Sequence, residues 1–339
     1  MKEAMLYEKL SDGRVHCYLC AHECKIGPGR KGVCQVRENQ DGTLYTLVYG
    51  RTIAKHVDPV EKKPLLHFYP GSRAYSVATP GCNFRCKWCQ NADISQMPRE
   101  RHLMAGTEAS PEEIVSAAQQ NRCRSIAYTY TEPTIFFEYS YDTAQAAHEE
   151  GLANVYVTNG FMTEEMLETF DPCLDAANVD LKAFDDEVYR EHVGARLQPV
   201  LDSLKKMKAL GVWVEVTTLV IPDLNDDPEE LRQIAGFIAD DLGPETPWHI
   251  SRFRPAYEMR DRSMTPLSTL QEAQAIGEEA GLHYIYVGNV PGESNTVCHA
   301  CGQTLVRRSG YRIVDNLVDE DGGCPNCSTE VAGVGMAGS

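Results

Sequence analysis

The sequence predicts an α/β fold, a partial (β/α)6 TIM-like barrel with a small cysteine-rich, metal-binding extension at each end. Within residues 71–292, strand-like runs alternate with helix-like segments, which is the pattern of parallel strands joined by right-handed crossovers. Six such units are too few to close an eight-stranded barrel. Residues 1–70 and 293–339 hold cysteines at two- and three-residue gaps, a spacing typical of metal ligands.

The expected strands are short strand-like runs at residues 74–79, 125–130, 153–158, 178–181, 212–221 and 283–287. A shorter run at 249–251 is either a further strand or an irregular segment. Helices are expected between the runs. Ser110 and Asp227 each precede a proline and two glutamates, the pattern of an N-cap with proline at the first helical position. Three further helices end just before a glycine, a usual helix stop: residues 135–150, 199–210 and 266–280.

Composition and charge limit the classes of function. The chain has 339 residues, of which 42% are hydrophobic, enough for one large core with small appendages. Its net charge of -17 repels phosphate, so nucleic acid is not an expected partner. No apolar run approaches the roughly 20 residues of a membrane span, and the N-terminus lacks an apolar signal core. Thirteen cysteines, eleven of them in metal-type clusters, predict a reducing, cytoplasmic location.

Three cysteines within eight residues, Cys82, Cys86 and Cys89, directly follow the first expected strand. A four-iron, four-sulfur cube usually takes four thiolates, so three thiolates leave one iron open for chemistry. A zinc knuckle is the alternative, but zinc would need a fourth ligand. The neighbouring Arg85 and Lys87 are expected to favour the thiolate form. The spacing therefore predicts a catalytic [4Fe-4S] site at the C-terminal end of a barrel strand.

The stretch around these cysteines reads Cys-Asn-x-x-Cys-x-Trp-Cys-x-Asn, with Trp88 before the third cysteine. It resembles the signature loop of radical S-adenosylmethionine (SAM) enzymes, in the form found in the branch of pyruvate formate-lyase activating enzyme. Nearly the whole chain resembles more closely the radical SAM enzymes of the AmmeMemoRadiSam system, through the first cysteine group, residues 128–133 and 288–292, and the cysteine-rich tail. The resemblance implies a [4Fe-4S] cluster, SAM near Trp88, and a one-electron donor of the ferredoxin or flavodoxin type.

The same resemblance implies a cofactor-binding acid after the second strand. Relatives often carry Gly-Gly-Glu-Pro there, where backbone and acid hold the amino group of the methionine moiety. Glu132 and Pro133 match this pattern, whereas Tyr130 and Thr131 replace the two glycines. Alternatively, Glu132 is an acid at a helix start that interacts with the helix dipole.

Later strand ends carry further candidates for binding SAM. Asn159 offers a donor and an acceptor to a ribose or carboxylate, unless it is a plain turn residue. Asp180 and Lys182 share one face by alternation and either present charge to a ligand carboxylate or form a structural salt bridge. Gly288 and Asn289 are expected to bring backbone close to the adenine. Substrate contact is expected from one of three residues at the shorter run: His249, Arg252 and Arg254.

Two accessory cysteine groups flank the expected barrel. Two Cys-x2-Cys pairs predict a zinc ribbon or rubredoxin-like segment, with zinc favoured: Cys298, Cys301, Cys324 and Cys327. The N-terminal group can close a tetrahedral zinc, which is slightly favoured, or hold a second iron–sulfur cluster, and spacing alone does not separate the two: Cys17, Cys20, Cys24 and Cys34. Cys123 and Cys173 stand alone and are expected to be buried, inert thiols. Residues 331–339 are rich in glycine and alanine and are expected to be disordered.

These features together predict an enzyme that reductively cleaves SAM to a 5′-deoxyadenosyl radical, which then takes a hydrogen atom from its substrate. Resemblance to activating enzymes implies a glycine in a partner protein as that substrate. Radical modification of another protein side chain or of a small molecule is a second hypothesis. A non-catalytic iron–sulfur protein, for electron transfer or interaction, is a third, kept open by the altered glycine pair.

Overall fold

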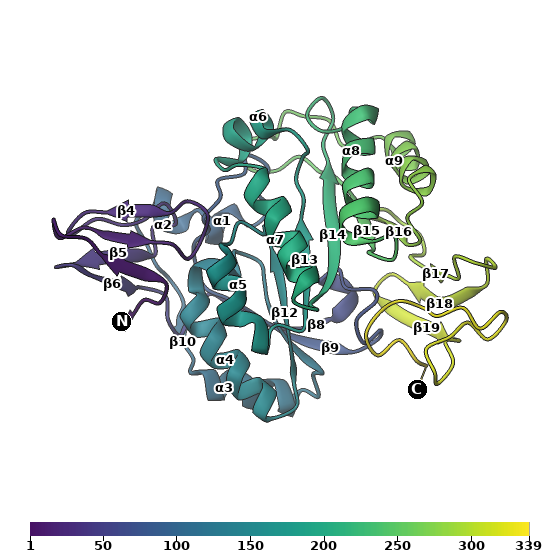
Figure 1. The fold of residues 1–339 in the computed structure, drawn as a ribbon, viewed down its shortest axis with the longest axis horizontal. Coiled ribbons are helices and arrows are strands. Elements are labelled where there is room, and N and C mark those ends of the chain that lie inside the picture. Colours follow the sequence, from purple (N-terminus) through teal and green to yellow (C-terminus); the bar gives the residue numbers. More distant parts are fainter. Residues whose placement is uncertain (339) are drawn as a thin grey trace.

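The computed structural model describes residues 1–338 and is built around one eight-stranded sheet (Figure 1). The strands follow the order β16-β15-β14-β13-β12-β11-β9-β8, parallel from β9 to β16, with β8 antiparallel at the edge. In chain order they are β8 (Ala54–Pro59), β9 (Arg73–Ala78), β11 (Ser125–Tyr128), β12 (Ala153–Thr158), β13 (Ala176–Asp180), β14 (Trp213–Val220), β15 (Trp248–Arg252) and β16 (Ile285–Gly288). The α/β partial barrel is confirmed, and the uncertain run at 249–251 is a true strand, because β15 pairs with both neighbours.

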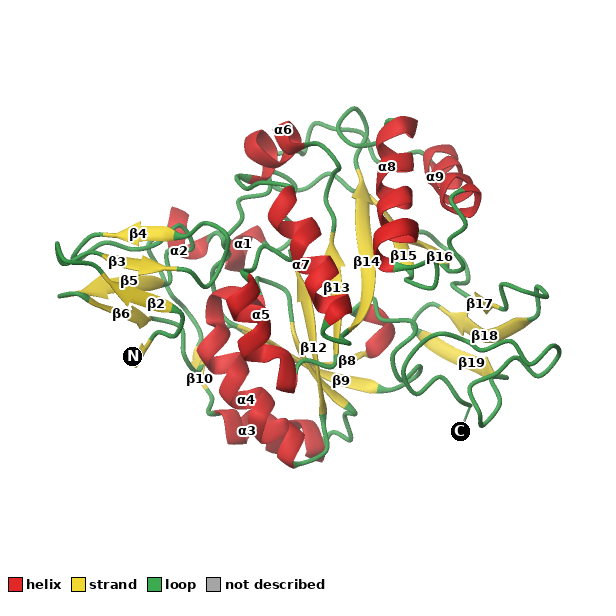
Figure 2. Ribbon diagram, in the orientation of Figure 1, coloured by secondary structure: helices red, strands yellow, loops and turns green. Residues whose placement is uncertain are grey.

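Helices in the crossovers cover the outer face of this sheet (Figure 2). The main ones are α3 (Pro111–Gln120), α4 (Phe137–Glu149), α5 (Glu164–Phe170), α7 (Gln198–Ala209), α8 (Pro228–Phe237) and α9 (Leu267–Glu279). The predicted starts are confirmed, since Ser110 and Glu113 form a capping box and Asp227 accepts from two backbone amides. Shorter helical pieces are α1 (Ala92–Ser95), α2 (Met97–Glu100), α6 (Asp186–Val188), η1 (Val60–Lys62), η2 (Pro133–Phe136), η3 (Asp171–Cys173), η4 (Tyr189–Val193) and η5 (Ile238–Leu242). Within residues 1–338, none of the helices has both the length and the apolar character needed to cross a membrane.

Short antiparallel strands form an N-terminal module at one end of the long axis (Figure 1). They make two three-stranded sheets, β1-β6-β5 and β2-β3-β4. The strands are β1 (Lys2–Glu3), β2 (Tyr7–Lys9), β3 (Val15–Cys17), β4 (Cys24–Ile26), β5 (Arg37–Gln40) and β6 (Thr43–Thr46), while β7 (Arg51–Thr52) pairs with β10 (Thr107–Glu108). The expected extension over residues 1–70 also contains β8, which is hydrogen-bonded to β9 in the central sheet.

A second antiparallel module lies at the opposite end of the molecule, formed by β17 (Thr296–Val297), β18 (Thr304–Ser309) and β19 (Arg312–Asn316). The expectation of a disordered tail is wrong for the described residues. Val331 and Met336 are buried, and Val334 exchanges backbone hydrogen bonds with His67 (2.8 Å) and Tyr69 (2.7 Å). A few apolar side chains among the glycines are enough to fix the segment. Ser339 lies outside the described residues.

A buried carboxylate connects this tail region to the barrel interior. Glu215 on β14 accepts hydrogen bonds from the backbone of Leu66 (3.0 Å) and His67 (2.8 Å) and from the ring of His249 (2.6 Å). His67 in turn donates through Nδ1 to the carbonyl of Ala332 (2.6 Å). Because an unpaired buried charge is costly, these donors are what permit Glu215 to be fully buried.

Candidate active site

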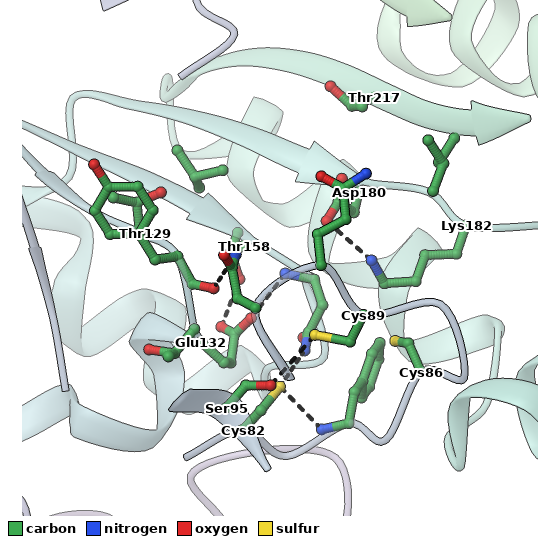
Figure 3. A pocket seen from close by; sticks show the side chains of 18 of the residues that line it. Cys82, Cys86, Cys89, Ser95, Thr129, Glu132, Thr158, Asp180, Lys182 and Thr217 are labelled. Carbon is green, nitrogen blue, oxygen red and sulfur yellow. Dashed lines mark hydrogen bonds and ion pairs between the residues drawn. The ribbon is translucent and has the colours of Figure 1, made fainter. Parts of the chain in front are cut away.

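The loop after β9 carries the three clustered cysteines to the C-terminal ends of the parallel strands. Cys82, Cys86 and Cys89 line one cavity of about 320 Å³ there (Figure 3). The loop is tight at Gly81, which has φ of 109° and whose Cβ, if it had one, would lie 2.7 Å from Val36. A side chain at position 81 would therefore displace the loop, so glycine is required here.

Polar groups surround the sulfur atoms. The Cys82 sulfur accepts from the backbone amide of Phe84 (3.3 Å) and lies 3.9 Å from Nδ2 of Asn159. The Cys89 sulfur lies 3.3 Å from the hydroxyl of Ser95. Ser95 belongs to the short helix α1 and has no motif of its own, so only the folded loop shows that it contacts the site.

Cys82 and Cys86 are not activated in the way the sequence predicted. Burial raises the pKa of Cys86 to about 12 and that of Cys82 well above its usual value. Lys182 is the cation whose charge partly offsets this effect at Cys86, rather than Arg85 or Lys87. Buried thiols of this kind release their protons and become thiolates when they bind a metal.

Glu132 and Asn159 form one hydrogen-bonded unit next to Cys82. Oε1 of Glu132 accepts from the amide (3.1 Å) and hydroxyl (2.6 Å) of Thr134 and from the hydroxyl of Thr158 (2.7 Å). Its Oε2 accepts from the backbone amide of Asn159 (2.9 Å). Both residues line the cavity, so the structure brings these two predicted residues together. Glu132 also caps η2, so the helix-start alternative describes part of its role.

Tyr130 occupies a position where relatives often carry glycine, and its backbone adopts a conformation that glycine reaches easily. Its φ is 66°, in the left-handed region that non-glycine residues rarely occupy. Its hydroxyl donates to Asp58, and the Lys63 ammonium lies 4.7 Å from the ring centre. The Tyr130 carbonyl accepts from Nδ2 of Asn91 (2.8 Å), the last residue of the cysteine motif. The backbone turn therefore persists although its sequence signature has changed.

Asp180 and Lys182 lie on one side of the cavity, joined by an ion pair of 2.9 Å (Figure 3). Burial lowers the pKa of Lys182, but the charge of Asp180 outweighs this and raises it overall. The salt bridge that the sequence offered as an alternative is therefore present. Because both side chains also line the cavity, contact with a ligand remains a prediction.

The remaining candidates divide between this cavity and a second one of about 340 Å³. Trp88 and Asn289 line the first cavity, whereas Gly288 and His249 line only the second. The two cavities share four residues, so they adjoin: Lys62, Pro64, Ser251 and Asn289. Arg252 and Arg254 line neither cavity and instead contact the carbonyls of Thr265 and Asn289.

The C-terminal cysteines form a compact group. Their four sulfurs all lie within 4.8 Å of one another, with separations of 3.6 Å for Cys298–Cys327 and 3.7 Å for Cys301–Cys324. This group can hold a metal ion. The lone residues Cys123 and Cys173 are buried and free, as expected.

Comparison with known proteins agrees with this geometry. The model of the Radical SAM superfamily matches residues 76–235, which include all three cysteines of the loop. Uncharacterized protein MJ0808 of Methanocaldococcus jannaschii is 45% identical, over 98% of this chain and 99% of its own length. Pyruvate formate-lyase-activating enzyme of Clostridium pasteurianum is 28% identical, over 50% of this chain and 70% of its own length. The chain belongs to the radical SAM superfamily.

A solved structure of a protein bound to S-adenosylmethionine shares the fold of this chain. Streptococcus suis SuiB bound to S-adenosylmethionine superposes with a TM-score of 0.51 at 14% identity, over 68% of this chain and 53% of that chain. Membership in the superfamily implies a [4Fe-4S] cluster and SAM. The residues present fit such a cluster, because three thiols face one cavity and Nδ2 of Asn83, beside Cys82, is a buried donor without a partner among the described residues.

Proposed function

We propose that this radical SAM enzyme binds its cluster through Cys82, Cys86 and Cys89 and abstracts hydrogen from a glycine of a partner protein. When bound, the reduced cluster supplies one electron to the sulfonium of SAM, and the broken carbon–sulfur bond leaves methionine and a 5′-deoxyadenosyl radical. The observation that carries the proposal is the convergence of these three thiols on one cavity at the strand ends. A fourth thiolate would close that site.

The other cavity residues position the ligands and exclude water. Asn159 directs its side-chain amide at the Cys82 sulfur, and Glu132 holds the Asn159 backbone. The Asp180–Lys182 pair presents fixed charges of both signs, which suit the carboxylate and ammonium of the methionine moiety. Trp88 is 4% exposed and seals the cavity beside the third cysteine.

The decisive experiment measures 5′-deoxyadenosine. Anaerobically reconstituted protein with dithionite and SAM is expected to release it, and Cys82→Ala is expected to abolish the release. Cys123→Ala is the matched control, because this buried thiol lies outside the cavity and its loss should leave activity unchanged. Absence of 5′-deoxyadenosine from cluster-loaded wild-type protein would contradict the proposal.

Support for a protein substrate comes from the relatives and from the second cavity. Relatives include proteins named pyruvate formate-lyase-activating enzyme and putative glycyl-radical enzyme activating enzyme, the latter at 25% identity. The second cavity adjoins the first, so a loop of a partner protein bound there would lie next to the cysteine site. The electron would come from a ferredoxin- or flavodoxin-type donor, and thirteen free cysteines favour a reducing cytoplasm.

For the C-terminal group we propose zinc. Four thiolates at about 2.3 Å from one zinc in a tetrahedron are about 3.8 Å apart. The separations of 3.6 and 3.7 Å in this group match that value. A zinc ion would stabilise a module that has few buried residues of its own.

A further inference from the structure

The four N-terminal cysteines come from different elements but face one site. Pairing of β3 with β4 places Cys17 directly opposite Cys24. Cys20 lies between these two strands, and Cys34 lies in the loop before β5. The charges of the other three thiols act on the thiol of Cys20, which places the four side chains in one region of the module.

The sulfur spacing of this group differs from that of the C-terminal group. The C-terminal sulfurs all lie within 4.8 Å of one another, whereas no three of the N-terminal thiols, which the structure describes in full, meet that limit. In a four-iron cube each thiolate binds a different iron, so the thiolates stand further apart than around a single ion. The N-terminal set therefore lacks the close sulfur spacing of the C-terminal group, which suits a single tetrahedral ion, and this favours a cube.

A buried donor without a partner lies beside this group. Arg37 is 2% exposed, pairs with Glu138 at 2.9 Å and donates to the carbonyl of Met5 at 2.6 Å. Its Nε is buried and has no partner among the described residues, while the charges of Cys17 and Cys34 act on its guanidinium. Sulfide of a bound cluster would supply the missing acceptor, and such hydrogen bonds tune cluster potentials.

The group also contacts the catalytic loop directly. Nε2 of His22, two residues beyond the second cysteine of the group, donates to the carbonyl of Asn83 at 2.9 Å. Asn83 follows Cys82, so one hydrogen bond connects the two cysteine-bearing segments. The carbonyl of Cys34 lies 3.5 Å from the position of a Cβ on Gly81, the residue before Cys82.

We infer that Cys17, Cys20, Cys24 and Cys34 hold a second [4Fe-4S] cluster that relays electrons to the catalytic one. Four protein thiolates leave no iron open, so this cluster does not bind SAM. One electron passes from a low-potential donor protein to the second cluster and then to the catalytic cluster, and each donor returns to its oxidised form. The relay rests on the proposed function, because the catalytic cluster is its acceptor.

Metal analysis of the full chain tests the second cluster. Anaerobically reconstituted wild-type protein is expected to hold about eight iron and eight sulfide per chain. Cys20→Ser/Cys24→Ser should fall to about four iron and keep an electron paramagnetic resonance signal that changes with SAM. The control Cys123→Ser/Cys173→Ser should keep all of its iron. Wild-type protein with only about four iron and extra zinc would overturn the inference.

The converse variant covers the case in which the first fails to fold. Cys82→Ser/Cys86→Ser/Cys89→Ser is expected to keep about four iron, with a resonance signal that SAM does not alter. If this variant holds no iron, the second cluster does not exist. If it keeps iron and responds to SAM, the assignment of the open site is wrong.

The choice of reductant tests the relay. Dithionite is small and reduces the catalytic cluster directly, so 5′-deoxyadenosine formation by Cys20→Ser/Cys24→Ser should stay within about threefold of wild type. With reduced flavodoxin the same variant should be at least about tenfold slower. An equal rate with flavodoxin would overturn the relay. No product from wild type with dithionite would contradict the proposed function, while the iron counts would still decide whether the second cluster exists.

Discussion

Glu132 receives four hydrogen bonds from within the protein before any ligand is present. A carboxylate has about four acceptor sites, so little capacity remains for an ammonium group. Burial raises the pKa of Glu132, and hydrogen bonds from Thr134, Asn159 and Thr158 only partly offset this. Glu132 therefore affects the site mainly by holding the backbone of Asn159, whose side-chain amide lies near the Cys82 sulfur.

Glu132→Gln tests this positioning role. The side-chain NH2 group that this substitution introduces cannot accept a hydrogen bond. It must face one of the present donors, either the backbone amide of Asn159 or the hydroxyl of Thr158, so one hydrogen bond is lost. Loss of a hydrogen bond to a charged group costs about 1.5–3 kcal/mol. SAM affinity should therefore fall by about 10- to 100-fold, measured by titrating the cluster's resonance signal, with iron content unchanged. Glu165→Gln at the exposed start of α5 is the control. Unchanged affinity would show that Asn159 does not depend on Glu132.

At the scale of elements, the turn between β11 and α4 contains a strained residue. The left-handed conformation of Tyr130 costs roughly 1–2 kcal/mol for a non-glycine residue. Its hydroxyl, with Lys62 and Lys63, surrounds Asp58. Burial raises the pKa of Asp58, but these three donors outweigh it and lower the pKa overall. The side-chain contacts thus offset the backbone strain.

Tyr130→Phe removes the hydroxyl and keeps the ring and the backbone. The variant should lose about 1–3 kcal/mol of stability, read as a lower midpoint of urea unfolding, because Asp58 loses one donor. Affinity for SAM should stay within about threefold, because the turn itself is retained. Tyr311→Phe, at an exposed tyrosine, is the matched control and should change neither quantity. A midpoint equal to that of wild type would mean that the hydroxyl does not stabilise the turn.

Local signals explain which elements could be predicted. Capping residues and helix-ending glycines act on residues only a few positions away in the sequence. The helix that starts after Ser110 and the helix that ends before Gly211 were therefore predictable. The edge strand β8 was not, because Lys55 and His56 are exposed and its pairing depends on β9. The cysteine loop was predictable from spacing, whereas Ser95 reaches it only by tertiary folding.

At the scale of the whole molecule, two small modules are attached to the barrel by buried polar contacts. The N-terminal module is joined by the pair Arg37–Glu138, and the C-terminal module through His67 and Glu215. Composition alone could not place these boundaries, because Arg37, Glu138, His67 and Glu215 are polar residue types that become buried only through contacts between segments far apart in the sequence. The two modules lie at opposite ends of the molecule (Figure 1), and the active-site cavity is lined by the cysteine loop and strand ends of the barrel.

His67 makes the C-terminal attachment sensitive to pH. Its Nδ1 donates to Ala332, and its Nε2 accepts from the hydroxyl of Tyr286 (2.6 Å), so the ring is neutral. Burial lowers the pKa of His67 to about 4, against the opposing charge of Glu215. The unfolded chain, with a histidine pKa near 6.5, takes up a proton between pH 6.5 and 4 that the folded protein does not. Folding stability should therefore decrease as pH falls through this range.

His67→Gln keeps a donor and an acceptor but cannot titrate. Between pH 7 and 5 the wild-type protein should lose about 2 kcal/mol more unfolding free energy than this variant, measured by urea unfolding. Acid also weakens metal binding by thiolates, but that loss is common to both proteins and cancels in the difference. His56→Gln, at an exposed histidine, should behave as wild type does. Equal losses in His67→Gln and wild type would mean that His67 is not the group linking pH to the C-terminal attachment.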